Sequence, residues 1–248
     1  FSNISLSDVV FGSDITADNS TTYMSFFSQM DTYGDGYAGI GVWRAAFKPL
    51  VDRIADTDIR LQWFCCDRST GVTDASGKRV TLIRDTKYPV SVEYQTVKFI
   101  GTGRDNIKAG VFSGWELGDY IYLRSEEAYM IKMEALAHKG SADAITELNS
   151  FMKTRQPDYN YTFTNKADLI EEIIYQKRVE FWGEGLEYID NRRLNIPVDR
   201  TDETWGAENN NHFSAGKFRY NQEERPFLYQ LPLSEIENNS QLSPTDQN

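Results

Sequence analysis

The chain has 248 residues and a formal net charge of −11. This length can bury a substantial core, as one large domain or two small ones, without metals or disulfides. A phosphate backbone requires clustered Lys and Arg, so the acidic balance excludes nucleic acid as a partner. No run of about 18 consecutive apolar residues occurs, so no membrane span is predicted. Cys65 and Cys66 are adjacent, and because a vicinal disulfide is strained, we interpret both as thiols.

Residues 1–118 are predicted to be a loop-rich part with short strands. The apolar run at residues 9–11 is a candidate strand. The apolar spacing of residues 42–54 predicts a short helix that Pro49 interrupts. Rough alternation of β-branched and aromatic residues, with Gly and Asp turns between the segments, predicts three further strand regions: 61–66, 79–84 and 90–100.

Residues 119–197 change character and predict a helical scaffold. Helices are expected at residues 122–139 and 142–155, with Gly140 as the stop of the first and Ser141 as the cap of the second. So short a connection requires the two helices to run antiparallel. The apolar residues expected to face inward on the first helix are Leu123, Met130, Ile131, Met133 and Ala137.

Residues 165–197 predict a third helix of seven or eight turns with one apolar stripe. Asn165 is the expected cap, with Asp168 three residues further on. Gly183 and Gly185 lie inside this pattern, where each glycine costs about 1 kcal/mol relative to alanine. We therefore expect a neighbour packed closely against the bare backbone.

Residues 198–248 are predicted to be a long polar loop followed by a closing segment. Residues 227–233 within it have the composition of a final strand. The chain begins with Phe1 rather than Met, so any targeting segment is expected upstream.

Three glutamates would share nearly one side of the third helix. Glu180, Glu184 and Glu187 stand at i, i+4 and i+7, and paired carboxylates about 5 to 10 Å apart are what a glycosidase uses. Acids interleaved with arginines on one helix more often form i,i+4 ion pairs. We favour that structural interpretation, with these arginines as partners: Arg178, Arg192 and Arg193.

Other motifs lack the context that their chemistry requires. Gly34, Gly36 and Gly39 match G-x-G-x-x-G, but no hydrophobic strand precedes them, so a nucleotide site is not predicted. Asp31 and Asp35 lack the spacing of a calcium loop. The only histidines, His138 and His212, are far apart in sequence and do not indicate a metal site. No catalytic residue, metal or cofactor is therefore predicted.

Aromatic side chains are the best candidates for ligand contacts. A flat ring can stack on the apolar face of a pyranose while nearby Asn and Asp bind hydroxyls. Tyr33 and Tyr37 are the strongest candidates because flanking Gly and Asp residues place them in a loop. The other candidates are Trp43, Trp63, Trp115 and Trp205, of which Trp63 stands in an apolar run and is expected to be more buried.

Four segments carry a resemblance to a known family. They are YLRSEEAYMIKMEA from Tyr122, QKRVEFWGEG from Gln176, YIDNRRL from Tyr188 and the closing LPLSEIENN from Leu231. In this order they resemble the C-terminal portion of the SusD/RagB family of nutrient-binding outer-membrane lipoproteins. Ser240 departs from the pattern, because relatives carry Pro there. The family's N-terminal helical repeats and lipid-bearing cysteine are not seen in residues 1–248.

The resemblance implies a mainly α fold: a tetratricopeptide-type helical scaffold with irregular loops and a few short β-strands. It also implies non-enzymatic capture of an oligosaccharide or polysaccharide at the cell surface, for import through a SusC-like TonB-dependent transporter. Attachment to the outer membrane would depend on an upstream lipidated cysteine. Two alternatives stay open at this point: a glycoside hydrolase that uses the three glutamates, and a helical-repeat scaffold that binds only protein.

Overall fold

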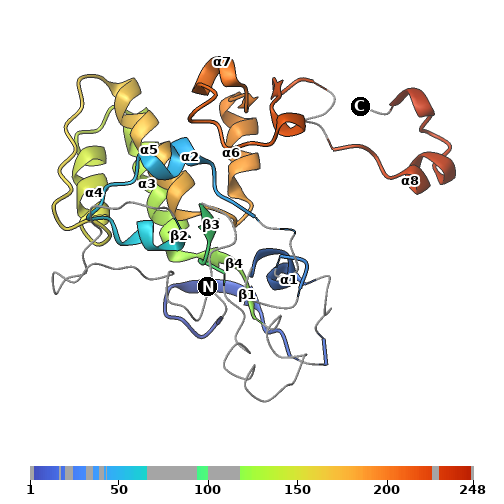
Figure 1. Cartoon of the computed structure of the whole chain (residues 1–248), viewed down its shortest axis with the longest axis horizontal. Coiled ribbons are helices and arrows are strands. Elements are labelled where there is room, and N and C mark those ends of the chain that lie inside the picture. The colour runs from blue at the N-terminus through green and yellow to red at the C-terminus, as the bar shows by residue number, and fades with distance from the viewer. Residues whose placement is uncertain are drawn as a thin grey trace. The chain divides into compact units, whose positions relative to one another are not determined.

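The computed structural model describes residues 3–16, 18–19, 25–31, 36–38, 42, 44–65, 94–99, 118–224 and 229–246. The chain divides into two compact units, Phe1–Glu180 and Phe181–Asn248, here called the first and second units. The described elements are mainly helices with short two-stranded sheets (Figure 1), which confirms the predicted mainly α class with short β-strands. Among the described residues, no helix combines the length and apolarity needed to cross a membrane.

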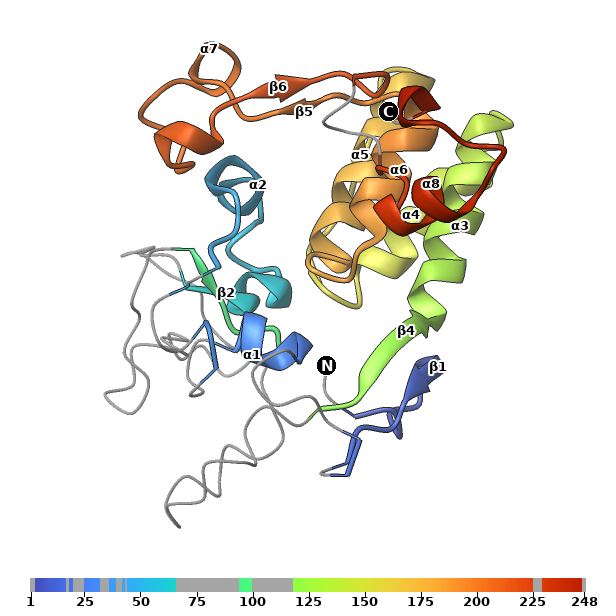
Figure 2. The same cartoon turned by 90° about the vertical axis from the view of Figure 1, so that its right-hand side faces the viewer.

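The first unit contains an antiparallel strand pair that joins distant parts of the chain. Strand β1 (Val9–Ser13) pairs with β4 (Tyr120–Arg124), and Ser13 lies opposite Tyr120 (Figure 2). The strand at residues 9–11 is therefore confirmed. The helix expected from residue 122 begins three residues later, because residues 122–124 satisfy their backbone groups by pairing with β1 instead.

Between these strands the described elements are short. They are α1 (Phe26–Met30), α2 (Lys48–Asp52), the 3-10 helix η2 (Ile59–Trp63), and the paired strands β2 (Phe64–Cys65) and β3 (Gln95–Thr96). Pro49 lies in the first turn of α2, where a missing N–H costs nothing, so it starts this helix rather than interrupting one. The region 61–66 is only partly a strand, and residues 79–84 lie outside the described part of the chain.

Three helices form the scaffold of the first unit. Helix α3 (Ser125–His138) packs against both α4 (Asp143–Met152) and α5 (Lys166–Glu180). The core of this group consists of Met130, Met133, Ala137, Ala144, Leu148, Met152, Leu169, Ile173 and Val179. Ile131, expected inside, is 53% exposed, and Leu123 is also exposed in β4.

Side-chain caps hold the starts of two of these helices as the sequence predicts. The Asn165 side chain accepts a hydrogen bond from the Asp168 N–H at 3.0 Å. The Ser141 hydroxyl accepts one from the Asp143 N–H at 3.2 Å. Each cap satisfies a backbone donor that has no partner within the helix.

The long third helix predicted over residues 165–197 does not exist as one helix. Helix α5 ends at Glu180, and α6 (Leu186–Leu194) begins after a turn in which Gly183 and Gly185 have φ of +79° and +87°. Those left-handed angles are accessible to glycine without strain, so the glycines break the helix. The close neighbour expected at Gly185 is also absent, since an added Cβ would meet no described atom within 4 Å.

The second unit continues from α6 with small elements. Strands β5 (Val198–Asp199) and β6 (Arg219–Tyr220) pair antiparallel. The remaining described elements are α7 (Asp202–Trp205), η4 (Ser214–Gly216), α8 (Leu233–Asn238) and η6 (Pro244–Asp246). The strand expected at residues 227–233 is wrong in its described part, because residues 229–232 form no strand and Leu233 begins α8 after Pro232. Residues 225–228 lie outside the described part.

Candidate functional site

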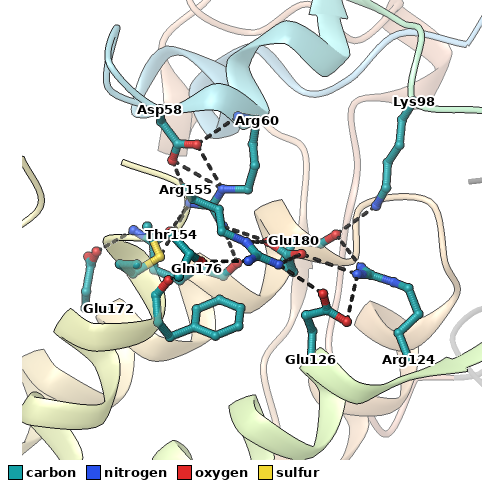
Figure 3. Close-up of polar contacts among 12 residues, drawn as sticks. Asp58, Arg60, Lys98, Arg124, Glu126, Thr154, Arg155, Glu172, Gln176 and Glu180 are labelled. Carbon is teal, nitrogen blue, oxygen red and sulfur yellow. Dashed lines mark hydrogen bonds and ion pairs between the residues drawn. The ribbon is translucent and has the colours of Figure 1, made fainter. Parts of the chain in front are cut away.

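The carboxylate of Glu180 lies at the centre of a buried charge network in the first unit (Figure 3). Its side chain is 1% exposed and contacts three arginines from three other parts of the chain. Arg155 Nη2 is 3.0 Å from Oε1, Arg124 Nη1 is 3.4 Å from Oε1, and Arg60 Nη1 is 3.4 Å from Oε2. These ion pairs connect β4, η2 and the turn that follows α4 to the last residue of α5.

Arg60 extends this network toward the middle of α5. Its fully buried guanidinium donates to Asp58 Oδ2 at 2.6 Å and to Gln176 Oε1 at 2.5 Å. Gln176 Nε2 in turn donates to Glu172 Oε1 at 2.7 Å. Asp58 also caps η2, since its Oδ1 accepts from the Arg60 N–H at 2.9 Å. A chain of paired polar groups therefore runs along one side of α5 from Glu180 to Glu172.

The charges of the network keep Glu180 ionised. Burial alone raises the pKa of Glu180, but the hydrogen bond and charge of Arg155, with the charges of Arg60 and Arg124, outweigh burial and lower the pKa to about 2. A general acid needs a proton near neutral pH, and this carboxyl holds none there.

The three glutamates do not share one helix face in the structure, contrary to the prediction. Glu180 ends α5, Glu184 lies in the following turn, and Glu187 is in the first turn of α6. The structural interpretation was correct for Glu180, but the partners were wrong. Its arginines come from elements distant in sequence rather than from i,i+4 neighbours.

A cleft of about 340 Å³ opens beside the Glu172 end of the network. It lies in the first unit, between the end of α2, the turn into η2, the α4–α5 connection and α5. Its lining residues are Arg53, Ile54, Ala55, Asp58, Gln156, Asp158, Tyr159, Asn160, Tyr161, Glu172, Tyr175 and Gln176. We call it the tyrosine cleft. Its volume falls in the range of small-ligand sites, which is about 300 to 1,000 Å³.

Glu172 organises the wall of the tyrosine cleft. Tyr159 donates its hydroxyl to Glu172 Oε1 at 2.8 Å, and Arg53 Nη2 donates to Oε2 at 2.5 Å. The Arg53 guanidinium carbon lies 3.8 Å from the centre of the Tyr175 ring. Burial is the main cause that raises the pKa of both Tyr159 and Tyr175, so both phenols stay protonated.

Hydrogen bonds hold the α4–α5 connection, residues 153–165, on both of its sides. Asn149 accepts from the Tyr161 N–H at 2.7 Å and donates to its carbonyl at 3.1 Å. The Tyr161 hydroxyl donates to the Asp168 carbonyl at 3.0 Å. Thr57 donates to Asp158 Oδ1 at 2.7 Å. This connection is not among the sites predicted from the sequence, although two tyrosines around an asparagine just before a capped helix are a visible signal.

The structure describes three of the six predicted aromatic site residues. Tyr37 and Trp63 belong to the first unit and Trp205 to the second, while Tyr33, Trp43 and Trp115 lie outside the described residues. Tyr37 is 42% exposed, as a stacking residue needs. The buried Lys98 ammonium lies 4.7 Å from the centre of the Trp63 ring and covers part of it. Trp205 is 37% exposed, and its indole N–H donates to the Asp199 carbonyl at 2.9 Å.

The structure also describes the surroundings of the glycine motif and the places of the two histidines. Gly36 lies so close to α1 that a Cβ there would stand 2.6 Å from Ser28 Cα. The described element before this glycine motif is the helix α1, where a nucleotide fingerprint needs a strand. His138 belongs to the first unit and His212 to the second. Among the described residues, no group of three or more His, Cys, Asp or Glu is arranged to hold a metal ion.

Fold and site together define a mainly helical protein with a small polar cleft and a buried ion-pair network. The SusD family model matches residues 9–248. The chain therefore belongs to the SusD family. No curated protein matches it.

Solved structures support the same fold. A SusD-like carbohydrate binding protein from Bacteroides vulgatus is 21% identical, with a TM-score of 0.62 over 98% of this chain and 49% of that one. A putative sugar binding protein from the same organism is 20% identical, with a TM-score of 0.60 over 97% and 45%. A SusD superfamily protein from Bacteroides thetaiotaomicron is 17% identical, with a TM-score of 0.59 over 98% and 48%. This chain spans about half the length of these structures.

Proposed function

We propose that the protein binds a glycan without cleaving it and serves nutrient uptake at the bacterial cell surface. The observation that carries this proposal is the match of the SusD family model to residues 9–248. Two structures of similar fold bear names that refer to carbohydrate or sugar binding. The burial of Glu180 also agrees with the proposal, because Glu180 is one of the three glutamates on which the hydrolase alternative relies and its carboxylate is not accessible to a substrate.

The wider role follows the family resemblance. The protein would act at the outer membrane, held by a lipidated cysteine upstream of Phe1. It would deliver an oligosaccharide or polysaccharide to a SusC-like TonB-dependent transporter. Its net charge of −11 sets nucleic acid aside as a competing partner.

The first contacts with a glycan are proposed for the loop that carries Tyr33 and Tyr37. The exposure of the Tyr37 side chain supports this assignment, because a stacking ring must be reachable from solvent. Trp205 offers a second exposed ring in the second unit. Trp43 and Trp115 remain sequence-based candidates, and Trp63 is a weaker one because Lys98 lies over its ring.

Affinity electrophoresis in gels that contain single polysaccharides tests the proposal. The protein should be retarded by at least one polysaccharide and release no reducing sugar from it. Replacing both Tyr33 and Tyr37 with alanine should weaken binding about tenfold, the effect of losing about 1.4 kcal/mol of stacking. Tyr129→Ala is the matched control, since Tyr129 is an exposed tyrosine on α3. Retardation by none of a broad panel, or release of reducing sugar that Glu180→Gln abolishes, would contradict the proposal.

A further inference from the structure

The tyrosine cleft is a built site that the proposed loop contacts do not use. We propose that it binds one neutral, hydroxyl-rich sugar ring, as a second glycan subsite that shares no residue with the Tyr33 and Tyr37 loop. The ligand class rests on the proposed function, while the location rests on the cleft itself.

Hydrogen bonds hold the cleft in shape before any ligand arrives. Tyr161 is fixed through its backbone by Asn149 and through its hydroxyl by the Asp168 carbonyl. Tyr159 is fixed by Glu172. The opposite wall is joined to the same connection, because the Ile59 N–H donates to the Arg155 carbonyl at 3.0 Å. A preformed site avoids the entropic cost of ordering side chains when a ligand binds.

The charges around the cleft favour a neutral ligand. Arg53 is paired with Glu172, and Asp58 with the buried Arg60. Hydrogen bonds from Thr57 and Gln156 lower the pKa of Asp158 and keep it ionised. With the buried Arg60 counted, three lining acids and two arginines leave one net negative charge around the cleft. A carboxylate on the ligand, as in a uronic acid, would meet net repulsion, whereas hydroxyl groups would not.

Hydrogen-bonding groups remain available to a ligand at the mouth of the cleft. Within the described residues, Arg53 Nε and Nη1 and the Asn160 side-chain amide donate no hydrogen bond. The carboxylates of Asp158 and Glu172 supply acceptors nearby. A sugar hydroxyl both donates and accepts, so it can use both kinds of group. The half-buried Tyr161 ring offers the apolar surface that the CH face of a pyranose needs.

A site-resolved titration tests this inference directly. The intact chain, labelled with 15N, is titrated with glucose, galactose, mannose, xylose, maltose and cellobiose, and with glucuronate as the acidic comparison. At least one neutral sugar should shift the Asn160 side-chain amide and the Tyr161 backbone amide, and glucuronate should shift them less. The inference is overturned if no neutral sugar shifts the cleft signals, or if glucuronate shifts them as strongly as the neutral sugars do.

Variants then separate the cleft from the loop. Tyr161→Ala should lower the affinity for the sugar that shifts the cleft signals by about tenfold. Tyr161→Phe, which keeps the ring, should lower this affinity less. Asn160→Ala removes an exposed side chain and should also weaken binding without unfolding the chain. The control Tyr129→Ala should leave the affinity for the sugar unchanged. Unchanged affinity in both Tyr161→Ala and Asn160→Ala overturns the inference.

The two proposals can fail separately. If the protein is retarded by a polysaccharide while the cleft signals stay fixed, the cleft inference is wrong and the proposed function stands. If the cleft signals move and no polysaccharide retards the protein, the cleft inference stands and the proposed capture of polysaccharide is wrong.

Discussion

At the scale of single residues, Glu180 shows how one carboxylate can join elements from distant parts of the chain. Its three arginines come from β4, η2 and the turn that follows α4. Buried ions of this kind are costly unless every partner is present, so removing one partner destabilises strongly. The network therefore holds these elements together, and three of its members, Asp58, Glu172 and Gln176, also line the tyrosine cleft.

Glu180 should make the stability of the first unit depend on pH. Its pKa is about 2 in the fold and 4.5 without it, so its contribution is complete above about pH 4.5. The contribution is lost as the pH falls from about 4.5 toward 2. We expect Glu180→Gln to lower the free energy of unfolding by about 3 kcal/mol at neutral pH, and the difference from the native chain to shrink in acid.

Urea unfolding at a series of pH values measures both effects. Glu171→Gln serves as control because Glu171 is an exposed residue of the same helix, and it should change stability by less than about 0.5 kcal/mol. A difference between the native chain and Glu180→Gln that stays constant down to about pH 3 would show that the ion pairs contribute nothing.

At the scale of elements, the decisive feature is the turn between α5 and α6. Gly183 and Gly185 both adopt left-handed backbone angles, so the chain leaves the helix at Glu180 and starts another at Leu186. The end of α6 also has a residue in the left-handed conformation, but here it is Asn195, with a φ of +53°. Asparagine is among the few other residues that tolerate this conformation.

Gly185→Ala should therefore destabilise the chain by about 1 kcal/mol through backbone strain alone. An added Cβ meets no described atom within 4 Å, so crowding does not contribute. Gly185→Asn should cost less, because asparagine enters the left-handed region more easily. Thermal unfolding of the three proteins tests this. Equal stability of all three, or a larger loss for Asn than for Ala, would contradict the assigned conformation.

At the scale of the whole molecule, the chain is a SusD family member that spans about half the length of the structures it resembles. The two compact units each have their own short sheets and helices. Exposed aromatic residues occur in both units, with Tyr37 in the first and Trp205 in the second.

The proposed partnership with a transporter is a prediction for the protein in its own cells. A tagged copy should fractionate with the outer membrane and co-isolate with a TonB-dependent transporter after mild detergent extraction. The pair should persist at about 0.5 M salt if apolar contacts dominate it, because salt screens only exposed charges. Isolation without a transporter, or from a cytoplasmic fraction, would contradict the proposed role. The matched control is an unrelated tagged outer-membrane lipoprotein.

Local signals in the sequence determined much of the scaffold and the family. The periodicity of α4, the Ser141 and Asn165 caps and the quoted segments all lie within short windows. A side-chain period or a cap depends on neighbours a few residues away, so these features are readable without coordinates. The loop-borne Tyr37 was likewise recognisable as an exposed ring.

Only the tertiary structure decided the features that join distant residues. The pairing of β4 with β1 moved a helix start, and the arginines of Glu180 come from up to 120 positions away. The tyrosine cleft combines α2, the turn into η2, the α4–α5 connection and α5. Its residues are unremarkable one by one. Burial and distance make them a site, and neither is encoded in a window short enough to be read from the sequence.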